Sequence, residues 1–142
     1  MLISEIMTRE IESIGPDDTL QDAAMRMKEC GVGPLPVCEN QSVVGMLTDR
    51  DITLRAVAEG MDTATTCVRD VMSSEIVCCF EDQEVEVAAR LMQSKQIRRV
   101  LVLDRDKKLV GIVTLADLAS EAVDTQRAGE ILHVVSEAAP QS

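Results

Sequence analysis

One spacing of small and polar residues, Gly-x-x-Thr-x-x-Asp, occurs twice in the chain: Gly45, Thr48, Asp51 and Gly111, Thr114, Asp117. Each copy follows an apolar strand pattern and opens a helix pattern. The threonine and aspartate are therefore expected together at a helix N-terminus, beside backbone N–H groups without helical partners. A carboxylate placed there can accept hydrogen bonds from both hydroxyls of a ribose. The threonine hydroxyl, one turn earlier, can bind the same sugar or a phosphate oxygen.

The same spacing also has a purely structural explanation. Thr-x-x-Asp is close to a capping box, in which two side chains satisfy backbone N–H groups at a helix start and stabilise it by about 0.5–2 kcal/mol. A single copy would favour capping alone. Two copies at equivalent places favour a ligand site, and capping is compatible with ligand binding.

The two motifs belong to an internal repeat that covers most of the chain. A shift of 65 positions places Met7 on Met72 and aligns LQDAAMRM with VEVAARLM. One added residue in the following turn raises the shift to 66 and aligns VVGMLTDRDI with LVGIVTLADL. We therefore divide the chain into a first repeat (1–60), a linker (61–67), a second repeat (68–123) and a partly helical C-terminal extension (124–142).

Each repeat is predicted to begin with a short strand and a helix. The strands are expected over 11–14 and 76–79, and the acidic segments PDDT and EDQE that follow can cap a helix. The helix LQDAAMRMKEC carries four apolar residues on one face and ends before Gly31. These apolar residues are Leu20, Ala23, Ala24 and Met27.

Two strands around a polar turn and a second helix are expected to complete each repeat. In the first repeat the strands are LPVC and SVVGML, and in the second they are VLVL and LVGIV. The second helix begins after Thr48 or Thr114 and runs to about Glu59 in the first copy. Such a unit is too small to close a good core alone. The predicted fold class is therefore α/β (α+β), with two β-α-β-β-α repeats related by a pseudo-twofold axis and sheets packed face to face.

Composition argues against several classes of function. A formal net charge of −11 opposes binding to nucleic acids and to acidic membranes. Phe80 is the only aromatic residue, so a base-stacking platform is missing. No basic, apolar leader and no apolar stretch of about 20 residues occurs, so we expect a cytoplasmic protein without a membrane role. Five cysteines without CxxC spacing are expected to be reduced thiols.

No arrangement of residues indicates catalysis or a metal site. His133 is the only histidine and falls in a helix predicted around 128–137, and no Ser or Cys motif indicates a nucleophile. Phosphate-cradling glycine loops are missing. Met25, Met27 and Met92 are expected in the core. Neighbouring cysteines on a strand point to opposite faces, so Cys78 and Cys79 are interpreted as one buried and one exposed thiol rather than a redox or metal pair.

The doubled motif, with MTREIESIGPDDTL and GVGPLPV upstream of its first copy, resembles a pair of CBS domains, often called a Bateman module. The resemblance covers approximately residues 2–123, and the block GMLTDRDITLRAVAEG is particularly similar to stand-alone bacterial two-CBS proteins. It implies two sheets packed face to face with two clefts, dimerisation into a disc-like assembly, and sensing of AMP, ADP, ATP or a related adenosyl compound.

The resemblance also assigns roles to individual residues. Thr48 and Asp51 would hold the ribose in one cleft, and Thr114 and Asp117 would hold it in the other. The residues that would border adenine in the first repeat are Ser13, Ile14 and Pro16, and their counterparts in the second are Cys78, Cys79 and Glu81. The second set departs from the family pattern, which makes the second cleft less suited to adenine.

Phosphate groups require cations, and the resemblance places Arg98 and Arg99 where the family often has basic or polar residues facing the cleft. Gly33 and Pro34 take their places in the first repeat, so the charge differs between the clefts. Two further candidates are Arg50 and Arg55, because guanidinium forks match phosphate oxygens. A solvated surface charge is the simpler explanation for both.

Three functions are compatible with this sequence. The favoured one is a sensor that binds an adenosine nucleotide, changes conformation and acts on a protein effector in trans, since a ligand must prefer one arrangement to shift a population. The alternative is a dimeric scaffold or stress-associated CBS protein that binds no nucleotide. A hidden enzyme or thiol-redox protein has the least support, because no neighbouring residue predicts a reactive cysteine. No cofactor apart from the nucleotide is expected.

Overall fold

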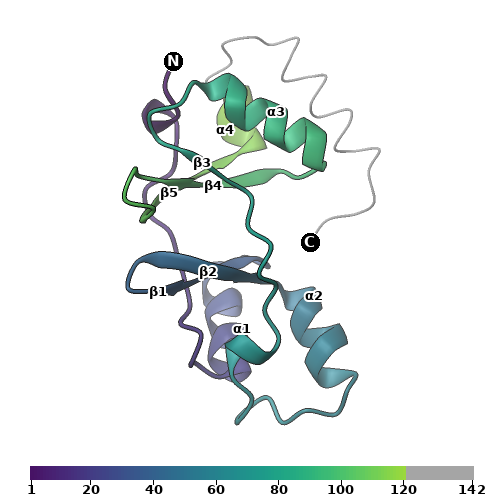
Figure 1. The fold of residues 1–142 in the computed structure, drawn as a ribbon. Helices are drawn as coiled ribbons and strands as arrows, with labels where there is room; N and C mark the ends of the chain where they lie inside the picture. Colours follow the sequence, from purple (N-terminus) through teal and green to yellow (C-terminus); the bar gives the residue numbers. More distant parts are fainter. Residues whose placement is uncertain (121–142) are drawn as a thin grey trace. The chain divides into compact units, whose positions relative to one another are not determined.

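The computed structural model describes residues 1–120, which fall into two compact units (Figure 1). The first unit is Glu12–Ile76. Among the described residues, the second unit combines Met1–Ile11 with residues 77–120. The helix predicted around 128–137, with His133, lies outside the described residues.

The first unit contains a two-stranded sheet with helices. Its elements are α1 (Leu20–Cys30), β1 (Leu35–Glu39), β2 (Ser42–Leu47), α2 (Asp49–Asp51), its π-helical continuation η2 (Ile52–Val57) and the 3-10 turn η3 (Val68–Asp70). β1 and β2 pair as an antiparallel hairpin. Asn40 and Gln41 form its turn, both with positive φ, as a type I′ hairpin turn requires.

The second unit contains a three-stranded sheet with α3 and α4 on one of its faces (Figure 1). Its elements are the 3-10 turn η1 (Ile3–Glu5), β3 (Cys78–Phe80), α3 (Val85–Lys95), β4 (Arg99–Leu103), β5 (Leu109–Thr114) and α4 (Leu115–Ser120). β3 runs parallel to β4, and β4 pairs antiparallel with β5. The predicted mixed α+β class is confirmed, and so are the paired strands of both repeats.

The strand expected over 11–14 is wrong, because only Ile14 pairs, in a single parallel bridge to Val37. In the second unit the backbone N–H of Glu81 donates to the carbonyl of Leu103 at 3.0 Å and carries the pairing on beyond Phe80. Pro16 stands at the equivalent place in the first unit and has no N–H to donate. The second strand forms as Cys78–Phe80, two residues later than its expected start.

Helix capping differs between the repeats. Thr19 caps α1 through a capping box with Asp22, and Gly31 ends the helix with a φ of 67°. The expectation that the segment EDQE caps α3 in the same way is wrong, because the side chain of its N-cap residue, Glu84, makes no capping hydrogen bond. Instead, the Glu84 carboxylate accepts a hydrogen bond from the amino terminus of Met1 at 3.0 Å. This interaction raises the pKa of the amino terminus.

Each unit has its own apolar core. In α1 the buried residues are Leu20, Ala23 and Met27, as predicted. Ala24 is exposed, and Met25 is 54% exposed, so the expectation that both face the core is wrong. The second helix of the first repeat ends at Val57, slightly before the predicted end. Among residues 1–120, no helix combines the length and the apolar character needed to cross a bilayer.

The opening segment of each repeat packs in the unit formed by the body of the other repeat. Backbone N–H groups of η1 donate to the carbonyls of Gln83 and Glu81, at 2.9 and 3.0 Å. Backbone N–H groups of η3 donate in the same way to Asp18 and Pro16, at 2.8 and 2.9 Å. A two-residue bridge then follows in each unit, Thr8 with Ile112 and Ser73 with Met46. We call this arrangement the exchange of the opening segments. In each unit it places the apolar opening segment of one repeat against the strand that precedes the motif of the other repeat.

Candidate functional site

Both Thr-x-x-Asp motifs form complete capping boxes. In the first, the backbone N–H of Asp51 donates to Thr48 Oγ1 at 3.0 Å, and the N–H of Thr48 donates to Asp51 Oδ2 at 3.0 Å. In the second, the corresponding distances for Thr114 and Asp117 are 3.1 and 2.9 Å. The structural explanation of the spacing is therefore present in both copies.

Capping uses only half of each carboxylate. Asp51 and Asp117 are half-buried, and each employs Oδ2 in its capping box. Neither Oδ1 atom accepts a hydrogen bond from the residues that the structure describes. Capping therefore leaves one oxygen of each carboxylate without a hydrogen-bond partner among residues 1–120.

The second motif lies next to two arginines. Arg99 is directly opposite Thr114 in the β4–β5 ladder, and residues opposite each other in an antiparallel pair present their side chains on the same face. The carbonyl of Arg98 accepts a hydrogen bond from the backbone N–H of Leu115, the residue after Thr114, at 2.9 Å. The structure therefore brings four predicted site residues together: Arg98, Arg99, Thr114 and Asp117.

The corresponding place beside the first motif carries no cation. The carbonyl of Gly33 accepts a hydrogen bond from the backbone N–H of Asp49 at 3.2 Å, as Arg98 does from Leu115. Arg50 and Arg55 are exposed, and neither guanidinium pairs with a residue in the described part of the chain. The charge difference between the repeats is therefore retained in the folded units.

The first-repeat residues expected near adenine are mostly engaged in the fold. Ile14 is 3% exposed, and both its backbone groups are used, since its N–H donates to Pro36 and its carbonyl accepts from Cys38. Pro16 is buried, and its carbonyl accepts from the N–H of Arg69. Ser13 is half-buried and forms a hydrogen bond with Cys38. Burial raises the pKa of the Cys38 thiol, although this contact lowers it.

Their second-repeat counterparts lie on β3. Cys78 and Cys79 pair with Leu101 and Val102 of β4, farther along that strand than Arg99. Cys79 is buried and Cys78 half-buried. Burial raises the pKa of both thiols, to about 12 for Cys79, so neither carries the depressed pKa of a reactive cysteine.

A groove of about 270 Å³ in the first unit lies beside α1 and is lined by Ile14, Asp18, Asp22, Met25, Arg26 and Glu29. The motif residues Thr48 and Asp51 are not part of it. Three carboxylates in its wall disfavour a phosphate group. Among residues 1–120, no three His, Cys, Asp or Glu side chains gather closely enough to hold a metal ion.

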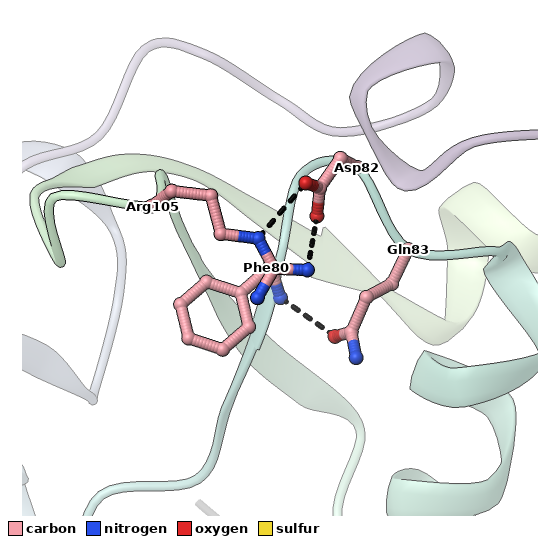
Figure 2. Close-up of polar contacts among 4 residues, drawn as sticks. All are labelled: Phe80, Asp82, Gln83 and Arg105. Carbon is pink, nitrogen blue, oxygen red and sulfur yellow. Dashed lines mark hydrogen bonds and ion pairs between the residues drawn. The ribbon is translucent and has the colours of Figure 1, made fainter.

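Sequence reasoning missed an arginine that lies over the single aromatic ring. Figure 2 shows Arg105, from the β4–β5 turn, paired through two hydrogen bonds of 2.8 Å with Asp82, and its guanidinium lies 4.2 Å from the centroid of Phe80. The side chain of Gln83 accepts from the N–H of Phe80 at 2.8 Å. No local spacing signals this cluster, because 23 positions separate Arg105 from Asp82.

Comparison with known proteins identifies the repeat. The family model for the CBS domain matches twice, over residues 3–57 and 68–124. The CBS domain-containing protein YhcV of Bacillus subtilis is 42% identical over 134 residues, which span 94% of each chain. Hypoxic response protein 1 of Mycobacterium tuberculosis is 35% identical over 116 residues, 81% of this chain and 80% of that protein.

Solved structures agree with this assignment. A crystal structure of Hypoxic Response Protein I with two coordinated zinc ions superimposes with a TM-score of 0.76 at 34% identity, covering 85% of this chain and 98% of that one. A structure of CBSX2 in complex with AMP gives a TM-score of 0.72 at 26% identity, covering 88% and 98%. The chain therefore belongs to the CBS-domain family and carries two tandem copies of the domain.

Proposed function

We propose that this protein is a regulatory module that binds an adenosine nucleotide, AMP, ADP, ATP or a related adenosyl compound, at its Thr-x-x-Asp motifs. Ligand binding changes its conformation, and a protein effector in trans reads the change. The observation that carries the proposal is the half-used carboxylate of Asp51 and of Asp117. Each holds its helix start through Oδ2 and leaves Oδ1 for a ribose hydroxyl.

The relatives support a binding role over a catalytic one. CBSX2, a structural neighbour at 26% identity, is known in complex with AMP. YhcV is described only by its CBS domains and matches this chain along 94% of its length. Cys30, Cys38, Cys67, Cys78 and Cys79 are all free thiols in the structure, which fits a reducing compartment, and the proposal places the protein in the cytoplasm.

Isothermal titration of the nucleotide-stripped protein with AMP, ADP, ATP and S-adenosylmethionine tests the proposal. We expect micromolar binding of at least one compound. Asp51→Ala and Asp117→Ala should each weaken the binding of whichever compound its own motif holds, and the double variant should abolish binding of every compound in the panel.

Asp22→Ala is the matched control. Asp22 completes the third capping box, with Thr19, in which the two hydrogen bonds are 3.1 and 3.4 Å long. This variant loses a capping carboxylate, as the motif variants do, but leaves both motifs intact. It should therefore bind nucleotide normally. Absence of binding across the panel, or normal binding by the Asp51→Ala/Asp117→Ala double variant, would contradict the proposal and favour the ligand-free scaffold.

The proposal includes a homodimer, supported by an exposed apolar row along the second helix of the first repeat. Leu54 and Val57 are 47% and 59% exposed and lie three residues apart on this helix, and Met61, beyond its end, is 42% exposed. A second copy of the chain would cover them. Val57→Lys should then shift the mass measured by sedimentation toward the monomer, whereas Lys28→Ala, at an exposed site on α1, should leave it unchanged.

A further inference from the structure

Gly33 and Arg98 occupy the same position in their units. Each lies before the first strand of the hairpin, and each carbonyl accepts a hydrogen bond from the residue that follows the motif threonine. Asp49 donates to Gly33 at 3.2 Å, and Leu115 donates to Arg98 at 2.9 Å. The backbone at this position therefore lies beside the start of the motif helix in both units.

A carboxylate fills the space that the missing side chain of Gly33 leaves. The Oδ1 atom of Asp49 lies 3.0 Å from the point where a Cβ atom would stand on Gly33, and its Oδ2 atom lies 3.3 Å from it. In the second unit the same point holds the Cβ atom of Arg98, and Leu115, the counterpart of Asp49, is 8% exposed and belongs to the core. The position beside the motif thus carries a negative charge in one unit and a positive charge in the other.

The neighbouring charges extend this difference. Arg98 and Arg99 give the second motif two exposed guanidinium groups, and neither forms a hydrogen bond or an ion pair through its side chain with the residues that the structure describes. Asp117 is the single carboxylate of that motif. In the first unit the motif carries two carboxylates, Asp49 and Asp51, and the exposed Arg50 and Arg55 lie on the helix that it opens.

We propose that the two motifs select ligands of different charge: the second, Thr114 and Asp117, takes an adenosine ligand with a phosphate group, and the first, Thr48 and Asp51, takes one without phosphate. This inference rests on the proposed function, in which the aspartates bind ribose. Guanidinium groups recognise phosphate oxygens through charge-assisted hydrogen bonds. Asp49 repels a phosphate and accepts a neutral or cationic substituent. Arg98, Arg99 and Asp49 are then the residues that determine specificity.

AMP and adenosine are the probes, because they differ only in the phosphate. The Asp51→Ala protein retains the second motif, and the Asp117→Ala protein retains the first. In equilibrium titrations, the Asp51→Ala protein should bind AMP at least about tenfold more tightly than adenosine. The Asp117→Ala protein should bind adenosine at least as tightly as AMP.

Charge variants test the named residues in these two backgrounds. Adding Arg98→Ala and Arg99→Ala to Asp51→Ala should weaken the binding of AMP by about tenfold or more and change the binding of adenosine by no more than about twofold. Adding Asp49→Asn to Asp117→Ala should strengthen the binding of AMP severalfold, because the amide keeps the shape of the side chain and removes its charge. At the second motif, added salt should weaken the binding of AMP and leave the binding of adenosine unchanged.

The outcomes separate the two proposals. If wild-type protein binds both probes and the two single-motif proteins show the same AMP-to-adenosine ratio, charge selection is overturned and nucleotide binding stands. The same holds if the charge variants leave both ratios unchanged. If wild-type protein binds none of the adenosine compounds, the proposed function is overturned, and charge selection falls with it.

Discussion

The sulfur atom of Met7 lies 2.5 Å from the point where a Cβ atom would stand on Gly111. In the other unit, the sulfur of Met72 lies 2.7 Å from the corresponding point on Gly45. Met7 and Met72 are repeat counterparts, and both belong to the opening segments that pack in the opposite unit. The glycine of each motif is therefore required by packing, because a side chain would collide with the exchanged methionine.

Gly45→Ala and Gly111→Ala should each destabilise the protein by about 1–3 kcal/mol, as overpacking of a core does. Neither glycine has the positive φ found at Gly31 and Gly60, so the effect comes from the collision and not from backbone strain. Denaturant unfolding followed by circular dichroism measures it. Unchanged midpoints for both variants would contradict the packing role.

The two collisions should respond differently to removal of the methionine. At Gly111 the three nearest atoms all belong to the flexible side chain of Met7, whereas at Gly45 the backbone carbonyl of Ser73 is also 2.7 Å away. Gly111→Ala should thus cost less in a Met7→Ala background than in wild type. Gly45→Ala should keep most of its cost in a Met72→Ala background. Equal costs in both backgrounds at Gly111 would show that Met7 does not limit the space.

Much of the fold follows from the sequence because the repeat supplies each pattern twice. Helix α1 and its cap at Gly31, together with the four hairpin strands, match their expected positions since apolar periodicity and turn residues determine them locally. The strand expected over 11–14 is reduced to a single bridge at Ile14, and Pro16 has no N–H to carry the pairing further, as Glu81 does in the second unit. The exchange of the opening segments depends on long-range contacts that no local pattern encodes.

The candidate site was predictable only in part. The spacing of Thr48 and Asp51 predicts both a capping box and a ligand group, and the capping geometry agrees with the first of these. The place of Asp49 could not be predicted, because its carboxylate fills a space opened by Gly33, a residue that lies 16 positions earlier in the chain. The residues next to a motif in the sequence can be predicted to lie near it, whereas side chains that reach it only through folding cannot.

The threonine of each motif should contribute to stability through its hydroxyl alone. Thr48→Ala and Thr114→Ala should each cost about 0.5–2 kcal/mol, because the backbone N–H of Asp51 or of Asp117 loses its acceptor. Thr48→Ser and Thr114→Ser keep the oxygen and should stay close to wild type. Thermal unfolding of the four variants checks this. An alanine variant as stable as its serine partner would show that the capping bond contributes nothing.

Arg105 should stabilise the second unit more than Arg69 stabilises the first. Both arginines form an ion pair, with Asp82 and Asp17, but only Arg105 also lies over an aromatic ring. Arg105→Ala should therefore lower the melting temperature more than Arg69→Ala does. Arg105→Lys should fall between wild type and Arg105→Ala, because lysine keeps the charge and loses the two-bond geometry with Asp82. Equal decreases in melting temperature for Arg105→Ala and Arg69→Ala would show that the contact of Arg105 with the Phe80 ring adds no stability.

The same pair predicts an acid dependence. Hydrogen bonding from Arg105 lowers the pKa of the Asp82 carboxyl below its ordinary value of 3.8. A lowered pKa in the folded state stabilises the protein above the ordinary value, and this stabilisation disappears as the pH falls through the lowered one. The stability difference between wild type and Arg105→Ala should thus shrink below about pH 3.8. NMR titration should show the pKa of Asp82 rising in the variant.

Cys79 should make the protein less stable in alkali. Burial raises the pKa of its thiol from 9.0 to about 12, and a Cys78 thiolate beside it adds to the rise. Between these values the unfolded chain releases the Cys79 proton while the folded chain retains it. The free energy of unfolding should therefore fall as the pH rises from about 9 toward 12.

Replacing the thiol isolates its share of this slope. Cys79→Ala should show a shallower loss of stability over the same pH range, because alanine has no proton to release. Cys30→Ala is the control, since Cys30 is exposed and should leave the slope unchanged. The chain contains no Tyr and no Trp, so the ultraviolet absorbance of the thiolates can be followed without phenolate interference. Parallel stability curves for wild type and Cys79→Ala would mean that Cys79 ionises as readily in the folded protein as in the unfolded chain.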